Sequence, residues 1–364
     1  MKKITIGIPA YKAHKHICDC LGSIQMQTMK ADIAIIVASD CPDDDYEYLK
    51  DKYNDLDITT LPCKENTGAG LARQRALDAC KTDWITFIDA DDVFYTPFAI
   101  ENLARNIQPN TIEVQGIFLQ EVENNPQGIR TMPQANPAHP WVFGRLYNVQ
   151  FLKQTGIAFS DLRAMEDGEF NWKIRMLIEG TPLQIVNVNE PVYLWRIGSE
   201  HSITRTGAEK DGIPQYNFDL CQIGATMASI RAAQFARKKN PFNGSIDRFI
   251  TEMMVGHYFT YVECKAKKPL FAKQNFFNAK RFYHECFKEI ESRIDDKIIA
   301  DIYTMQRSGH GNDLIGIIPD ISFFEFMDKI RKENYGGEEE LKKIRAKFPK
   351  KVIANDLKTG VATF

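Results

Sequence analysis

The chain has 364 residues, a formal net charge of −2, 44% apolar residues and 26% charged residues. This length predicts two or three domains, and the composition excludes a disordered, collagen-like or coiled-coil protein. No apolar run approaches the roughly 18 residues that a membrane span needs, and the N-terminus lacks the cleavage site of a secretory signal. The eight cysteines show no regular spacing, so we expect reduced thiols and a cytoplasmic protein.

Strand and helix patterns alternate through the first hundred residues. Short β-branched or apolar runs predict strands at 4–8, 33–37, 58–61 and 84–88. Helical spacing predicts helices at 14–28, 46–53 and 70–80. This alternation predicts an α/β fold with a mostly parallel sheet and helices on both faces. Ligands bind such sheets beyond the carboxyl ends of the strands, so the residues that follow each strand are the candidates for a site.

The rest of the chain divides into a mixed part and a helical part. After a strand at 112–120, the polar, Pro-rich stretch 124–140 resembles a mobile loop. An amphipathic helix at 170–178 and two short strands at 185–188 and 193–195 follow. From about residue 215 helices rich in Lys, Phe and Tyr dominate. We therefore expect a catalytic domain at 1–205, with an acidic excess, and a mainly α-helical, basic domain at 206–364.

An acidic turn, Asp89-Ala90-Asp91-Asp92, directly follows the strand at 84–88. Neighbouring carboxylates repel one another unless a cation or hydrogen-bond donors compensate. Mg²⁺ characteristically takes one or two carboxylates together with substrate phosphates. A simple acidic turn before a helix is the alternative, but the position at a strand's carboxyl end favours a metal site.

Several segments together resemble glycosyltransferase family 2, which consists of nucleotide-sugar enzymes with the Rossmann-like GT-A fold. The segments, in the family's order across residues 4–205, are Pro9-Ala10-Tyr11 with 20–28, Ile35–Asp44, Asn66–Arg75, Asp89–Asp92 and Glu166-Asp167. Each is weak alone, and their order makes the resemblance specific. It implies an inverting, metal-dependent transfer of a sugar from a nucleotide diphosphate, of UDP type, to a hydroxyl acceptor. Mn²⁺ or Mg²⁺ would be the cofactor.

The same resemblance implies roles for single residues in donor binding. Asp40 would hydrogen-bond the base, with Pro9 and Tyr11 packing beside it. Ser39 stands where the family usually has Asp, which leaves the choice of nucleotide open. Asp91 would bind the metal. The remaining residues expected to contact the nucleotide or its sugar are Asn66, Arg73, Asp89 and Glu166.

Asp167 would be the general base, because inverting transfer needs a carboxylate that takes the proton of the acceptor hydroxyl. The alternative for this acidic run is a helix N-terminus favoured by the helix dipole. Segment 195–205 resembles the family's closing loop, in which Arg196 and Arg205 would neutralise phosphate charge. His201 would be a further metal ligand or, alternatively, an exposed loop residue.

The basic C-terminal part leaves the acceptor open. Lys and Arg alternate there with Phe271, Phe276, Phe277 and Phe282. These stretches are either solvated helix faces around an aromatic core, or a groove for an anionic glycan, for DNA or for a membrane surface. A DNA glycosyltransferase acting on hydroxylated bases, a nucleotidyltransferase and a non-catalytic nucleotide-sugar-binding module are therefore the alternatives. Peripheral membrane contact and homo-oligomer formation are both compatible with this sequence.

Overall fold

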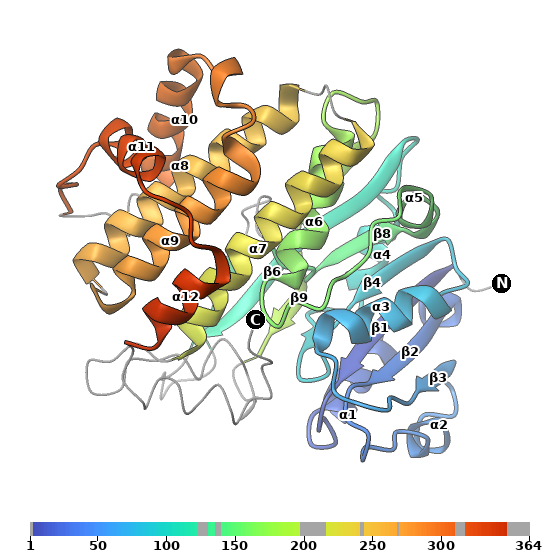
Figure 1. Cartoon of the computed structure of the whole chain (residues 1–364). Coiled ribbons are helices and arrows are strands. Elements are labelled where there is room, and N and C mark those ends of the chain that lie inside the picture. Colours follow the sequence, from blue (N-terminus) through green and yellow to red (C-terminus); the bar gives the residue numbers. More distant parts are fainter. Residues whose placement is uncertain are drawn as a thin grey trace. The chain divides into compact units, whose positions relative to one another are not determined.

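The computed structural model describes residues 3–122, 130–134, 140–196, 216–240, 244–267, 269–309 and 317–347. The chain forms two compact units. One comprises Met1–Ile174 with Gly180–His201, and the other comprises Arg175–Glu179 with Ser202–Phe364. The first unit contains the β-sheet and the second is helical (Figure 1). The fold class is therefore α/β with a helical C-terminal region, as the sequence predicts.

The first half of the sheet is parallel. Its strands are β1 (Ile4–Ala10), β2 (Ile33–Ser39), β3 (Ile58–Leu61) and β4 (Trp84–Phe87). They lie in the order β3-β2-β1-β4, and each neighbouring pair is parallel. β1 and β2 are buried along nearly their whole length, which explains the continuous apolar run of β2 and the β-branched residues of β1. Because the strands are parallel, the segments after β1, β2, β3 and β4 begin at one edge of the sheet.

Helix α3 (Ala69–Ala79) covers β1 and β2 (Figure 1). Its alanines and long straight side chains favour a helix. Ala72 and Ala76, one turn apart, pack with Ile36 and Ala38 of β2. These small side chains let the helix lie close to the sheet. Arg73, next to Ala72, is consequently buried as well.

The second half of the sheet is mixed. Its strands are β5 (Val93–Phe94), β6 (Thr111–Val122), β7 (Arg130–Gln134), β8 (Arg145–Asn148) and β9 (Gln184–Trp195). The sheet continues from β4 in the order β8-β6-β9-β5, with β7 paired to β6. β6 and β9 are parallel, whereas β8 is antiparallel to β4 and β6, β7 to β6 and β5 to β9. Because β8 pairs with β4, the mixed half and the parallel half form one continuous sheet.

Two local expectations for this region are wrong. The two short strands expected at 185–188 and 193–195 form the single strand β9, which passes Pro191 where its register with β6 shifts. A register irregularity is a place where a strand tolerates proline. In the stretch expected to be a loop, residues 130–134 form β7.

The first unit contains three further helices, which are α1 (Ile17–Gln25), α4 (Ala99–Ala104) and α5 (Val149–Thr155). A short helix, α2 (Tyr48–Lys52), precedes β3. Helix α6 (Glu166–Ile178) begins four residues earlier than the periodicity indicates. Glu166, Asp167 and Glu169 occupy its first turn, where the helix dipole favours negative charge. The acidic pair is therefore part of the helix.

The second unit is an assembly of helices with an aromatic core. Its α-helices are α7 (Tyr216–Lys239), α8 (Gly244–Lys267), α9 (Ala272–Phe282), α10 (Asp296–Gly309), α11 (Phe323–Lys332) and α12 (Gly337–Arg345). Phe326 contacts the rings of Tyr258, Tyr261 and Phe276 at centroid distances of 5.2–5.6 Å. Phe271, Phe276, Phe277 and Phe282 are all buried. These phenylalanines therefore belong to the core and are not exposed for stacking on bases.

Within the described part of the chain, no helix has the length and apolar character that crossing a membrane requires.

Candidate active site

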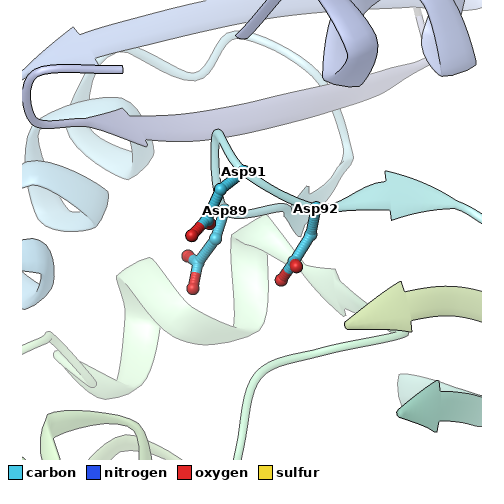
Figure 2. Close-up of side chains that lie close together, drawn as sticks. All are labelled: Asp89, Asp91 and Asp92. Atoms are coloured by element: carbon cyan, nitrogen blue, oxygen red, sulfur yellow. The ribbon is translucent and has the colours of Figure 1, made fainter. Parts of the chain in front are cut away.

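The acidic turn after β4 brings three carboxylates together. Asp89, Asp91 and Asp92 each offer an oxygen, and these oxygens lie within 4.8 Å of one another. Figure 2 shows the carboxylates of Asp89 and Asp91 next to each other, with that of Asp92 further along the turn. Oxygen ligands at this spacing suit a hard divalent cation.

Asp92 is held inside the protein by β9. The Tyr193 hydroxyl donates to its Oδ2 at 2.6 Å, and the Arg196 backbone N–H donates to its Oδ1 at 2.7 Å. The same hydroxyl accepts the Asp89 backbone N–H at 3.2 Å. Burial, reinforced by the charges of Asp91 and Asp89, raises the pKa of Asp92 well above its usual range. Asp92 therefore fixes the turn to β9, which leaves Asp89 and Asp91 as the more accessible carboxylates.

Arg73 is the centre of a buried ionic cluster. One of its terminal nitrogens, Nη1, donates to Glu166 at 2.9 Å and to Asp167 at 2.7 Å, and Nη2 donates to Asp89 at 2.7 Å. Its side chain is only 3% exposed. Burial alone lowers the pKa of Arg73, but the charges of Asp167, Asp89 and Glu166 outweigh it and raise that pKa overall. One guanidinium thus joins the turn after β4 to the start of α6.

Asp167 combines burial with an excess of negative charge. Its Oδ1 accepts from Arg73, and its Oδ2 accepts the Val142 backbone N–H at 3.3 Å. Burial raises the pKa of Asp167 to about 7, against the lowering effect of Arg73 and with added repulsion from Glu166 and Asp89. A carboxyl group with this pKa changes its protonation state near neutral pH, which is the property that a general base requires.

Asp40 lies at the carboxyl end of β2 and binds the loop before α3. Its carboxylate accepts the Thr67 N–H at 2.8 Å, the Thr67 hydroxyl at 2.9 Å and the Gly68 N–H at 2.8 Å. Asn66 donates to the Asp40 backbone carbonyl at 3.1 Å. Asp40, predicted to bind the base, and Asn66, predicted to contact the nucleotide or its sugar, therefore stabilise each other's loops, and most of the acceptor capacity of Asp40 is already used within the chain.

The structure brings most predicted site residues to one edge of the sheet. The remaining predicted residues differ in exposure, in their partners or in whether the structure describes them. Pro9 is half-buried in β1, and Tyr11, just beyond it, is 44% exposed. Arg196 is not oriented by the acidic turn alone, because its Nη1 donates to Asp19 of α1 at 2.9 Å. The predictions for His201 and Arg205 fall outside the described residues.

Sequence reasoning missed several residues that shape this edge. Arg163 donates to the Asn66 side chain at 2.5 Å and to its backbone carbonyl at 3.2 Å. Tyr193 bridges Asp89 and Asp92, and the backbone of Val142 reaches Asp167. A backbone N–H leaves no signal in a sequence, and neither Arg163 nor Tyr193 lies in a motif. These contacts are products of the tertiary fold.

Residues 5–166 match the family model described as "Glycosyl transferase family 2". This span contains β1 to β4, the acidic turn and the start of α6, so it covers the elements that carry Asp40, Arg73, Asp89 and Asp91. Over this part of its sequence, somewhat less than half of the chain, the protein is similar to glycosyl transferase family 2.

Curated relatives match part of the chain. Glycosyltransferase GlyA of Streptococcus pneumoniae is 24% identical over 233 residues, covering 57% of this chain and 32% of GlyA. Poly(ribitol-phosphate) beta-N-acetylglucosaminyltransferase TarS of Staphylococcus aureus is 25% identical over 186 residues, covering 48% of this chain and 32% of TarS. The chain thus matches about one third of the length of each of these relatives.

The structural similarity extends further than the sequence similarity. The crystal structure of S. aureus TarS 1–349 in complex with UDP-GlcNAc superposes with a TM-score of 0.59 at 17% identity, covering 85% of this chain and 92% of that one. TarS 1–349 without ligand gives a TM-score of 0.56 at 18% identity, with the same coverage. At these identities the similarity establishes the fold, which is the GT-A architecture with a helical region after it.

Proposed function

We propose that the protein is an inverting glycosyltransferase that moves a sugar from a nucleotide diphosphate sugar, of UDP type, to a hydroxyl acceptor. The observation that carries this proposal is the Arg73 cluster, which joins the acidic turn to Asp167 at the carboxyl edge of the sheet. The match of residues 5–166 to the family model supports the reaction class. The TarS complex with UDP-GlcNAc supports a uridine diphosphate donor.

Asp167 is the proposed base. Its carboxylate takes the proton of the acceptor hydroxyl while that oxygen forms a bond to the anomeric carbon of the donor sugar. The bond from this carbon to the diphosphate breaks with its electron pair on the leaving oxygen, and attack from the opposite face inverts the configuration. Arg73 holds Asp167 at 2.7 Å and favours its ionised form, which is the form that takes the proton.

Asp89 and Asp91 are the residues that fit a divalent cation, with Asp91 as the proposed ligand. The observation behind this fit is the donor set itself, because the carboxylate oxygens of the turn lie within 4.8 Å of one another. A bound Mn²⁺ or Mg²⁺ supplies charge neutralisation for the diphosphate. Asp92 supports the site indirectly, since its hydrogen bonds to Tyr193 and Arg196 keep the turn in place.

The proposed acceptor is a hydroxyl group on a phosphate-containing polymer. The name of TarS specifies poly(ribitol phosphate) as its acceptor. The basic excess of the C-terminal part of this chain suits an anionic polymer. The burial of the C-terminal phenylalanines counts against a DNA acceptor bound by base stacking.

The first prediction concerns Asp167. We expect Asp167→Asn to lower the transfer rate by at least about 10²-fold, since proton removal by a positioned base contributes ~10²–10⁴-fold. Donor binding should persist, because Asp91 is unchanged. The measurement is release of nucleoside diphosphate from UDP-GlcNAc with poly(ribitol phosphate), next to donor affinity by calorimetry. Asp78→Asn, on the outer side of α3, is the control. Full turnover by Asp167→Asn would remove Asp167 from the mechanism. In a separate assay, release of pyrophosphate from UTP and a sugar 1-phosphate would indicate a nucleotidyltransferase.

The second prediction concerns Asp91. Asp91→Asn replaces an anionic ligand by a neutral amide, so Mn²⁺ should no longer tighten UDP binding. The measurement is the thermal shift with UDP in the presence and absence of Mn²⁺, because a ligand that binds only the native state raises its stability. An unchanged Mn²⁺-dependent shift in Asp91→Asn would exclude Asp91 as the metal ligand.

A further inference from the structure

One peptide group, between Trp141 and Val142, connects two sets of buried side chains. Its carbonyl oxygen accepts from Arg145 Nε at 2.8 Å and from Asn171 Nδ2 at 3.1 Å. Its N–H donates to Asp167 Oδ2 at 3.3 Å. In a trans peptide the C=O and the N–H point in opposite directions. Side chains that hold the oxygen therefore direct the N–H toward Asp167.

Asn171 and Asp167 are one turn apart on α6, so both face the segment before β8. Asn171 also donates to the Pro140 carbonyl at 2.7 Å. Its own oxygen accepts from the Tyr147 hydroxyl at 2.9 Å. That contact orients the amide with its NH₂ group toward the two carbonyls. Asn171 is 1% exposed and Tyr147 is fully buried, so water does not compete for these bonds.

We infer that Asn171 is a positioning residue, which holds the Trp141–Val142 peptide so that its N–H binds the Asp167 carboxylate. The inference rests on the proposed function, in which Asp167 is the base. Arg145, whose charge is balanced by the buried Glu113, helps to hold the same peptide through its hydrogen bond to the Trp141 carbonyl oxygen. The peptide thereby favours the ionised form of Asp167.

Other charges also act on Asp167 and have to stay constant in a test. Arg73 of α3 favours its ionised form, while Glu166 of α6 and Asp89 after β4 oppose it. Tyr147 of β8 lies close enough to interact with it electrostatically. A change of Asn171 alone leaves Arg73, Glu166 and Asp89 in place. It removes the acceptor of the Tyr147 hydroxyl, but burial raises the pKa of Tyr147 and keeps this group uncharged in the tested range. Any change in Asp167 titration then reports on the peptide.

The test compares Asn171→Leu, which keeps the branched shape but removes both donors, with wild type. The rate at saturating donor and metal is followed from pH 5 to 9. We expect the acid limb to move up by about half a pH unit to one unit, since loss of a hydrogen bond to a carboxylate raises its pKa. The rate should recover toward wild type at high pH, and donor affinity should not change. Asn275→Leu, a buried asparagine of α9 whose Nδ2 donates to the Phe271 carbonyl, is the matched control and should leave the limb in place.

Asn171→Ser serves if the leucine variant does not fold, because its hydroxyl is too short to reach both carbonyls. An equal loss of rate at every pH, or a limb identical to that of wild type, would overturn the inference.

A second readout is independent of turnover. The free energy of unfolding of the wild type should fall as pH rises from about 4 to about 7, because the pKa of Asp167 is higher in the folded state than in the unfolded chain. Asp167→Asn should weaken this dependence, leaving the part that comes from the raised pKa of Asp92, and the Asn171 variants should extend the dependence to higher pH. If the wild type transfers no sugar, the proposed function fails, whereas this titration still decides the role of Asn171.

Discussion

The functional residues of this chain are defined by their partners more than by their types. Asp40, Asp92 and Asp167 are all buried aspartates, yet their environments differ. Asp40 binds backbone N–H groups, Asp92 binds a tyrosine hydroxyl and a backbone N–H, and Asp167 shares Arg73 with two other carboxylates. Of these, Asp167 has a pKa that burial raises to about 7, and it is the residue to which the proposed function gives the proton transfer.

A pH dependence follows at this scale. The pKa of Asp167, raised to about 7 chiefly by burial, predicts that the transfer rate at saturating donor rises with pH and levels off above about 7. The sign follows from the role of the base, which is active only when deprotonated. The measurement is the pH profile of kcat at fixed metal saturation. A profile that is flat down to pH 5 would contradict the shifted pKa.

At the scale of elements, the site depends on the close approach of α3 to the segment that precedes α6. A Cβ atom on Gly70 would lie 2.6 Å from the Ser160 carbonyl oxygen and 2.9 Å from Cγ of Glu166. Glu166 is one of the three partners of Arg73. The glycine near the start of α3 therefore permits the contact that assembles the ionic cluster.

Gly70→Ala should therefore lower both stability and activity. We expect a loss of about 1–3 kcal/mol in the free energy of unfolding, as for other overpacked sites, together with a lower kcat because Glu166 is displaced. Gly22→Ala in α1 is the matched control. A Cβ there meets nothing within 4 Å, so alanine should be neutral or stabilise by up to about 1 kcal/mol. Chemical denaturation of both variants is the measurement, and equal effects would show that the Gly70 contact is not tight.

Local sequence patterns predicted some of the helices and strands correctly and others only in part. Short β-branched or apolar runs identified β1, β2 and β4, which are largely buried. The sequence predicts two short strands at 185–188 and 193–195, yet β9 continues between them through a register shift, which no local pattern encodes. Helix α6 begins at Glu166 because its acidic first turn is favourable there, whereas apolar periodicity starts only at Phe170.

At the scale of the whole molecule, charge is unevenly distributed along the chain, with acidic residues in excess in the first part and basic residues in the second. An anionic acceptor would be attracted mainly by the C-terminal unit, and this attraction should weaken as salt rises. Lys238 and Lys239 at the end of α7 are both exposed.

We expect Lys238→Glu with Lys239→Glu to weaken retention on immobilised poly(ribitol phosphate) at low salt, without changing UDP binding. The matched control is Lys50→Glu with Lys52→Glu in α2, which makes the same change of charge on exposed lysines of the first unit. The measurement is the salt concentration at elution. Equal shifts for both double variants would show that net charge, and not the C-terminal unit, determines binding.

The sequence by itself determined the alternation of strands and helices in the first hundred residues, the family and the set of candidate residues at strand ends. It did so because burial on both faces, helical periodicity and short motifs are local properties. Only the tertiary structure decided that Asp92 anchors the turn, that Arg73 binds three carboxylates and that the Trp141–Val142 peptide reaches Asp167. Those contacts join residues far apart in the chain, and they depend on burial and direction, which no linear pattern specifies.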